Sequence, residues 1–258
     1  MFSREGSARS DRQNRQLAGY LAFVGGFVNS SGFVLIGTFT SHVTGNVGRL
    51  ANDAAFGQYA AALAALSLVL SFFAGAFSAS VIVESRFLSR LGPRAYAVAL
   101  ALEALLLLAF TALSYITIGA HARVLDGEAA LLCAAMGIQN ALVTRLSGAV
   151  VRTTHLTGVI TDLGIESARW FRFWRRSLSN ATRLPLVLGQ NAVEPPSSAK
   201  LLLLLTIALA FVLGAATGAV TAVRFKHSSM LLAAGSLVWG AFHALRNERA
   251  LARVASNS

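Results

Sequence analysis

Two short polar stretches of this chain carry almost the same residues. The first reads SHVTGN (41–46) and the second reads THLTGV (154–159), so a histidine stands just before a Thr-Gly pair in both. Hydroxyl and amide side chains donate and accept hydrogen bonds, and a glycine permits a sharp backbone bend. The imidazoles of His42 and His155 titrate near neutral pH, so they are also candidates for carrying a proton. Each Thr-Gly element is therefore a candidate binding element.

A Gly-x-x-Asn motif precedes each Thr-Gly element. It reads GFVN (26–29) in the first half and GIQN (137–140) in the second. An amide deep in an apolar helix is costly unless it is paired, so it either ties helices together or binds something. The predicted binding residues of the two halves are Asn29, His42, Thr44, Gly45, Asn46, Gln139, Asn140, His155, Thr157, Gly158 and Asp162.

A purely structural interpretation of the Thr-Gly elements stays open. Thr44 and Thr157 could each cap the helix that follows by accepting hydrogen bonds from its first N–H groups. Alternatively, those N–H groups and the positive end of the helix dipole could point at a ligand. The two histidines could likewise be hydrogen-bonding structural residues.

These elements lie in a strongly apolar chain. Of its 258 residues, 55% are hydrophobic and 13% are charged, whereas a soluble domain carries about 25% charged residues. A membrane-spanning helix needs roughly 17 to 25 apolar residues. The segments that meet this requirement are 17–38, 59–83, 95–118, 129–151, 201–223 and 230–245. The prediction is an all-α polytopic membrane protein with about six transmembrane helices.

The net charge of +11 follows a membrane topology. Of the 22 Lys and Arg residues, 17 lie in the segments 1–16, 84–94, 152–200 and 246–258, which share one side of the membrane. Positive residues accumulate on the cytoplasmic side, so this bias accounts for the charge without a nucleic-acid partner. We expect a protein of the bacterial cytoplasmic (inner) membrane with both termini in the cytoplasm.

The order of the motifs indicates an internal duplication, with repeat one at about 17–118 and repeat two at about 129–245. Each repeat has three spans, and because three is odd the second copy enters the membrane in the opposite direction. The prediction is a 3+3 inverted repeat in which each Thr-Gly element is a re-entrant bend followed by a half-helix. Residues 1–16 and 246–258 are predicted to form cytoplasmic tails. A Trp- and Arg-rich interfacial cytoplasmic helix is predicted over about 166–184.

Two charged residues fall inside predicted spans. Glu103 lies roughly 12 Å and Arg145 roughly 9 Å from the cytoplasmic ends of their spans, at about 1.5 Å of rise per residue. Because consecutive spans often pack together, we predict a Glu103–Arg145 ion pair. An ionisable residue inside the membrane is also a candidate functional residue.

Other kinds of chemistry find little support in the sequence. Cys133 is the one cysteine, and the five histidines show no zinc-binding spacing, so no metal or cofactor is expected. No nucleophile stands beside a base at a recognised spacing, and no nucleotide-binding loop is present. We therefore expect a protein that is not an enzyme.

The stretches GFVNSSGFVLIGTFTSHVTGNVGRLA and GIQNALVTRLSGAVVRTTHLTGVITDLG resemble the YoaK family of bacterial membrane proteins. The resemblance covers about residues 17–245 and implies a membrane location with about six spans. It implies no activity, because the family is a domain of unknown function. Relatives often carry Asp where this chain has Asn29, so this chain lacks a carboxylate there.

The inverted duplication and the buried polar residues favour a secondary transporter or channel-like carrier. Its ligand would be a small polar or anionic solute bound near the midplane, between the two Thr-Gly bends. The alternative is a non-transporting membrane assembly or lipid-interacting protein, in which the bends are packing devices. The lipid bilayer is the expected partner, and small-residue faces on the second and fifth spans would also suit a homo-oligomer.

Overall fold

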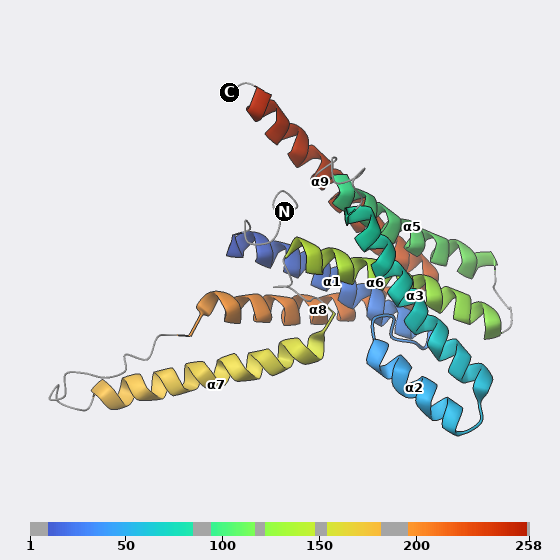
Figure 1. The fold of residues 1–258 in the computed structure, drawn as a ribbon, viewed down its shortest axis with the longest axis horizontal. Helices are drawn as coiled ribbons and strands as arrows, with labels where there is room; N and C mark the ends of the chain where they lie inside the picture. The colour runs from blue at the N-terminus through green and yellow to red at the C-terminus, as the bar shows by residue number, and fades with distance from the viewer. Residues whose placement is uncertain (1–9, 85–93, 117–121, 148–153, 182–195, 257–258) are drawn as a thin grey trace.

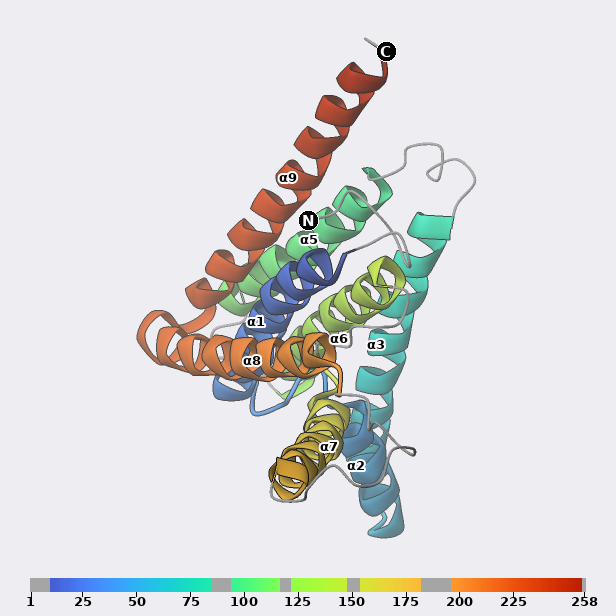
Figure 2. The same ribbon diagram turned by 90° about the vertical axis from the view of Figure 1, so that its left-hand side faces the viewer.

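The structure is a computed structural model that describes residues 10–84, 94–116, 122–147, 154–181 and 196–256. Within these ranges the chain forms helices and no strand (Figures 1 and 2). In chain order the elements are α1 (Asp11–Ile36), α2 (Val43–Ala55), α3 (Tyr59–Glu84), α5 (Arg94–Ile116), α6 (Ala122–Leu146), α7 (Leu156–Ala181), α8 (Ser198–Phe225), the short 3-10 helix η2 (Lys226–Ser229) and α9 (Met230–Ser256). The all-α prediction is confirmed.

Five helical stretches of the described chain are long and apolar enough to cross a membrane. They are Asp11–Ile36, Tyr59–Glu84, Ala95–Ile116, Gly127–Leu146 and Ser198–Arg246. The last stretch covers α8, η2 and most of α9, so it contains both the fifth and the sixth predicted spans. The chain is thus a polytopic helical membrane protein.

Four predicted boundaries need correction. One is the start of the predicted C-terminal tail 246–258, because α9 continues as a helix to Ser256. α1 begins inside the predicted tail 1–16, because Ser10 and Gln13 form a reciprocal capping box with bonds of 3.1 and 3.3 Å. α6 ends at Leu146 instead of 151. The Trp- and Arg-rich segment is not a separate interfacial helix, because α7 runs unbroken through it from Leu156. Residues 1–9 of the tail, 117–118 and 148–151 of two spans, 182–184 of that helix and 257–258 lie outside the described residues.

Glycines let α1 cross α8 with their backbones in contact. A Cβ atom on Gly214 would lie 2.0 Å from the carbonyl oxygen of Phe23, and one on Gly26 would lie 2.1 Å from that of Phe211. No side chain fits at either point, so only glycine permits this approach.

The same arrangement joins α3 to α6. A Cβ atom on Gly75 would lie 2.0 Å from the carbonyl oxygen of Ala134, and one on Gly137 would lie 2.0 Å from that of Phe72. The small-residue faces of the second and fifth spans therefore contact the fourth and first spans of the same chain.

Contacts along the helices fix their directions. Gly19 lies against Thr206 near the start of both α1 and α8, and further along Ser31 donates a 2.9 Å hydrogen bond to the carbonyl oxygen of Gly218. α1 and α8 therefore run in the same direction. Arg145 pairs with Glu84 where α6 and α3 both end, so these two helices also run in parallel.

The α1–α8 pair runs opposite to the α3–α6 pair. Gln139 donates a hydrogen bond from α6 to the carbonyl oxygen of Leu21 in α1, while Gly32, later in α1, faces Leu132, earlier in α6. α5 and α9 pack against each other at the side of this four-helix core. Tyr20 joins α1 to α9 through a 2.6 Å bond to the carbonyl oxygen of Ser236.

α2 and α7 lie outside this set of spans and pack on α3 and α8, respectively. Both views show them below the bundle, and in Figure 1 they extend from its middle toward opposite ends. α2 returns to the start of α3 through a turn of a few residues. Glu166 of α7 contacts Lys200 close to the start of α8. Each helix therefore runs back along the span that follows it.

The glycine crossings predict a position-specific cost of adding one methyl group. Gly137→Ala forces α3 and α6 apart and should lower the free energy of unfolding by about 1–3 kcal/mol. Gly235→Ala in α9 meets no heavy atom within 4 Å and should leave stability unchanged or raise it through helix propensity. Thermal unfolding of both purified variants in detergent checks this, and equal stabilities would contradict the close crossing.

Candidate functional site

Asn29 holds the non-helical segment that precedes α2. Its Oδ1 atom accepts hydrogen bonds from the backbone N–H of Ser41 at 3.0 Å, from the Ser41 hydroxyl at 3.1 Å and from the Thr40 hydroxyl at 3.5 Å. Backbone polar groups that leave a helix among membrane spans need partners within the protein. The Oδ1 atom of Asn29 is such a partner for the backbone N–H of Ser41.

Asn140 makes the corresponding contact in the second half. Its Oδ1 atom accepts a hydrogen bond from the hydroxyl of Thr154, and its Nδ2 atom donates a 2.8 Å bond to the carbonyl oxygen of Met136. Thr154 stands before His155 as Ser41 stands before His42. The same pair of motifs is therefore joined in both halves of the chain.

The helices that follow begin directly after the histidines. The carbonyl oxygen of His42 accepts from the N–H of Asn46, and that of His155 accepts from the N–H of Val159, each at 3.1 Å. His42 is the N-cap residue of α2, and its side chain makes no capping bond.

The prediction that Thr44 and Thr157 cap these helices is wrong. α2 begins at Val43 and α7 at Leu156, so both threonines already lie in the first turn. A residue inside the first turn does not have the extended backbone that a capping side chain requires. The helix starts are thus left without a threonine cap.

One pocket of about 390 Å³ is lined by both Thr-Gly elements. Its described lining consists of Ser41 and Val43 from the first element, Thr154 and His155 from the second, and Val69, Phe72, Phe73 and Ala76 from α3. The α3 residues lie near the middle of that span. The pocket therefore lies beside the middle of this span, where α2 and α7 begin, and most of its lining is apolar.

The remaining predicted residues divide into buried and exposed ones. Asn46 and Gln139 are buried, and the ring of His42 lies over Gly45, where a Cβ atom would be 2.1 Å from imidazole Cδ2. The exposed members of the set are His42, Thr44, His155, Thr157, Gly158 and Asp162, and Gly45 is half-buried. Of all the predicted residues, His155 is the one in the described lining of the pocket.

The predicted Glu103–Arg145 ion pair is wrong. Arg145 pairs with Glu84 instead, because α6 ends at Leu146 and brings Arg145 to the end of α3. Glu103 lies on α5 with none of its surface exposed, and neither carboxylate oxygen has a hydrogen-bond partner among the described residues.

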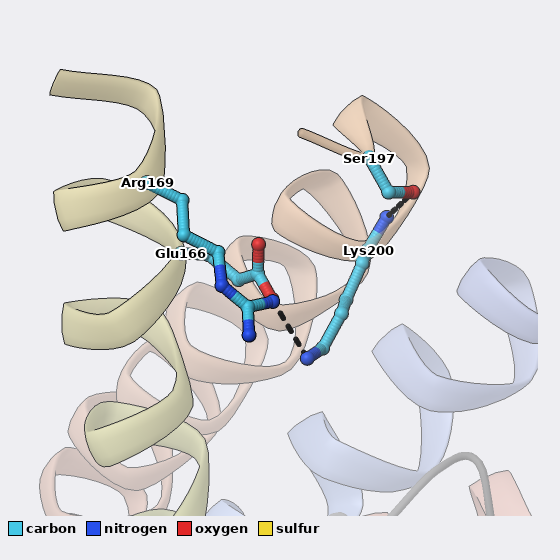
Figure 3. Close-up of polar contacts among 4 residues, drawn as sticks. All are labelled: Glu166, Arg169, Ser197 and Lys200. Atoms are coloured by element: carbon cyan, nitrogen blue, oxygen red, sulfur yellow. Dashed lines mark hydrogen bonds and ion pairs between the residues drawn. The ribbon is translucent and has the colours of Figure 1, made fainter. Parts of the chain in front are cut away.

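A second ionic contact was not anticipated. Glu166 is buried and accepts hydrogen bonds from Lys200 Nζ and Arg169 Nη1, each at 2.8 Å (Figure 3). The Lys200 hydrogen bond, aided by both positive charges, lowers the pKa of the Glu166 carboxyl. Ser197 caps α8 by accepting from the backbone N–H of Lys200, which fixes the start of the helix that carries the ammonium group.

The sequence held a signal for Glu166 that was missed. Glu166 follows Gly158 at the same spacing as Asp53 follows Gly45, so an acid stands at the corresponding position of both halves. Asp53 has a buried Oδ2 atom with no partner among the described residues. In the described chain no three His, Cys, Asp or Glu side chains gather where they could hold a metal ion.

Substitutions of Asn29 test its role as an acceptor. Asn29→Ala leaves the Ser41 N–H without its partner and should lower the free energy of unfolding by about 1–3 kcal/mol. Asn29→Asp keeps the accepting oxygen and should retain most of the stability. Thermal unfolding of the two variants compares them, and equal losses would show that acceptance at Oδ1 is unimportant.

The Glu166 contact predicts a pH-dependent contribution to stability. Because its pKa is lowered in the folded protein, the contact stabilises the fold above the ordinary carboxyl pKa of about 4.5. The contribution is lost as the pH falls through the lowered pKa. Wild type should therefore unfold at a higher temperature than Glu166→Gln at neutral pH, and this difference should shrink in acid. A difference that is independent of pH would contradict the ionic contact.

Comparison with known proteins places this architecture in a family. No curated protein and no solved structure matches the chain. A family model described as "Protein of unknown function (DUF1275)" matches residues 17–243, which span both Asn motifs, both Thr-Gly elements and nearly all of the membrane helices. The chain therefore belongs to this family, the YoaK-like family that its motifs resemble.

Proposed function

We propose that the protein is a secondary transporter or channel-like carrier for a small polar or anionic solute. The observation that supports this most directly is the pocket beside the middle of α3. Ser41 comes to it from the first half of the chain, and Thr154 and His155 come from the second. A site near the middle of the membrane to which both halves of a chain contribute is typical of secondary transporters.

The proposal includes an inverted duplication of the chain. In its support, Gly26 of α1 meets Phe211 of α8 in the way that Gly137 of α6 meets Phe72 of α3. The Asn–hydroxyl bond recurs in both halves. α1 and α6 run in opposite directions, as inverted copies must. Two equivalent but inverted halves allow an inward-open and an outward-open state of similar energy, which is the basis of alternating access.

The chemistry of the pocket favours a small solute with a polar or negatively charged group. α2 and α7 both begin there, and the start of a helix carries partial positive charge and free N–H groups. The hydroxyl oxygens of Ser41 and Thr154, whose protons are donated to Asn29 and Asn140, can accept hydrogen bonds, and His155 brings an imidazole. We propose binding and passage of this solute, without covalent catalysis.

The proposed location is the bacterial cytoplasmic membrane, with both termini in the cytoplasm. The bias of positive residues toward 1–16, 84–94, 152–200 and 246–258 supports this orientation. The start of α1 and the end of α9 lie toward the same end of the bundle (Figure 1). On α7, Arg172 and Arg175 are exposed, as a helix at the anionic cytoplasmic surface would have them.

One observation favours the second candidate function, a lipid-interacting or assembly protein that does not transport. Beyond its contact with Lys200, α7 projects past the start of α8 (Figure 1). Phe171 and Trp174 on this projection are exposed beside the arginines. Such a helix binds the headgroup region of a membrane. Under this alternative, the pocket has no solute and the projecting part of α7 is the working surface.

Uptake measurements distinguish the two functions. Solutes that raise the unfolding temperature of the purified protein would be tested for uptake into proteoliposomes. Thr154→Val removes a pocket hydroxyl and should reduce uptake at least tenfold with unchanged protein level. Thr161→Val is the matched control, because the hydroxyl of this exposed residue donates to the Thr157 carbonyl of its own helix and the residue is not in the described lining of the pocket. Full uptake by Thr154→Val would contradict the site, and absence of any binding or uptake would favour the alternative.

A further inference from the structure

Glu103 lies near the middle of α5, in the interior of the membrane domain. Glu103 has no exposed surface. Ala99, Leu100 and Leu107, which lie one turn away on the same face of the helix, have none either. Both carboxyl oxygens lack a hydrogen-bond partner among the described residues. The group is thus a buried acid in apolar surroundings, and no role has yet been assigned to it.

An ionised carboxylate in this position would be costly. Removing an unpaired charge from water is strongly unfavourable, and the usual outcome is that the group becomes neutral. A neutral carboxylic acid has a far smaller cost, because only its polar O–H and C=O groups are desolvated. The burial and the missing partners therefore indicate that Glu103 carries a proton in this conformation.

Among the side chains that the structure describes, the elements around Glu103 offer it no cation. α5 packs against α3, α6, η2 and α9, and Tyr20 of α1 lies within electrostatic range of Glu103. The described charged or titratable groups on these elements and on α5 itself are Tyr20, Tyr59, Glu84, Tyr96, Tyr115, Glu128, Cys133, Arg145, Lys226, His227, His243 and Arg246.

The cationic or titratable nitrogen groups in this set are engaged elsewhere or lie at the ends of the spans. Arg145 pairs with Glu84, and the ring of His227 lies against Phe110. Lys226 lies in the turn between α8 and α9, and Arg246 stacks on Phe242. The ring of His243 packs on Trp239. Among the described residues, then, no ion pair compensates a charge on Glu103.

We propose that Glu103 is a proton-binding site of the membrane domain, protonated in the described conformation and deprotonated only when the helices around α5 admit water. The step is a simple equilibrium in which the carboxylate takes one proton from water to form the acid. This inference goes beyond the proposed carrier and does not depend on it. If the carrier is established, Glu103 becomes the candidate group that couples solute movement to a proton.

Infrared spectroscopy of the purified protein at neutral pH tests the protonation state directly. The difference spectrum of wild type minus Glu103→Gln should show the C=O band of a protonated carboxylic acid. Glu84→Gln is the matched control, because Glu84 is an exposed acid paired with Arg145, and its removal should subtract an ionised carboxylate band. If Glu103→Gln also subtracts only a carboxylate band, the proposal is overturned. Should that variant fail to fold, wild type alone decides against the proposal if it has no protonated-acid band at neutral pH.

The pH dependence of stability gives a second, independent readout. The folded protein holds the Glu103 proton, whereas the unfolded chain releases it above about pH 4.3. The unfolded state then binds fewer protons, so stability must fall as the pH rises. Relative to Glu103→Gln, wild type should lose unfolding temperature from about pH 5 to about pH 8. A difference in unfolding temperature between wild type and Glu103→Gln that stays constant over this pH range overturns the proposal. This result is independent of whether the protein transports a solute.

Discussion

The backbone between Gly37 and Val43 leaves helical geometry among the membrane spans, where its polar groups need partners within the protein or in a water-filled cavity. This constraint governs the architecture. Asn29 satisfies it for the first half by accepting from the Ser41 N–H and hydroxyl. Asn140 binds the Thr154 hydroxyl in the second half. These bonds tie Ser41 to α1 and Thr154 to α6, so α2 and α7 both begin at the pocket beside the middle of α3.

The glycine crossings make this arrangement possible. Gly26 and Gly214 bring α1 against α8, and Gly75 and Gly137 bring α3 against α6. Each pair therefore joins a helix of one half to a helix of the other, so neither half packs as a separate unit. The bends lie beside these crossings and share one pocket. A relative movement of the two helix pairs would change the shape of that pocket, which is the mechanical link that the proposed carrier needs.

Much of the fold could be predicted from the sequence, because hydropathy and motif order act through local rules. The membrane spans, the family and the importance of the two Asn motifs came from such patterns. The partners of charged residues could not be predicted in this way. The partner of Arg145 depends on where α6 ends, and the sequence does not fix a helix end to the exact residue. Thr44 and Thr157 were misassigned for a similar reason, a shift of the helix start. The pocket could not be predicted from the sequence, because nothing distinguishes Phe72 and Phe73 from the other apolar residues of their span.

The central claim is that the two Thr-Gly elements face one another across a single site. The most direct measurement is cross-linking within one chain of the double variant Ser41→Cys/Thr154→Cys, with Cys133 replaced by Ala, in native membranes. A short thiol-specific reagent should link the two cysteines efficiently, and Ser41→Cys paired with Thr161→Cys on α7 should link poorly. Efficient labelling of both single cysteines without a cross-link between them would contradict the account.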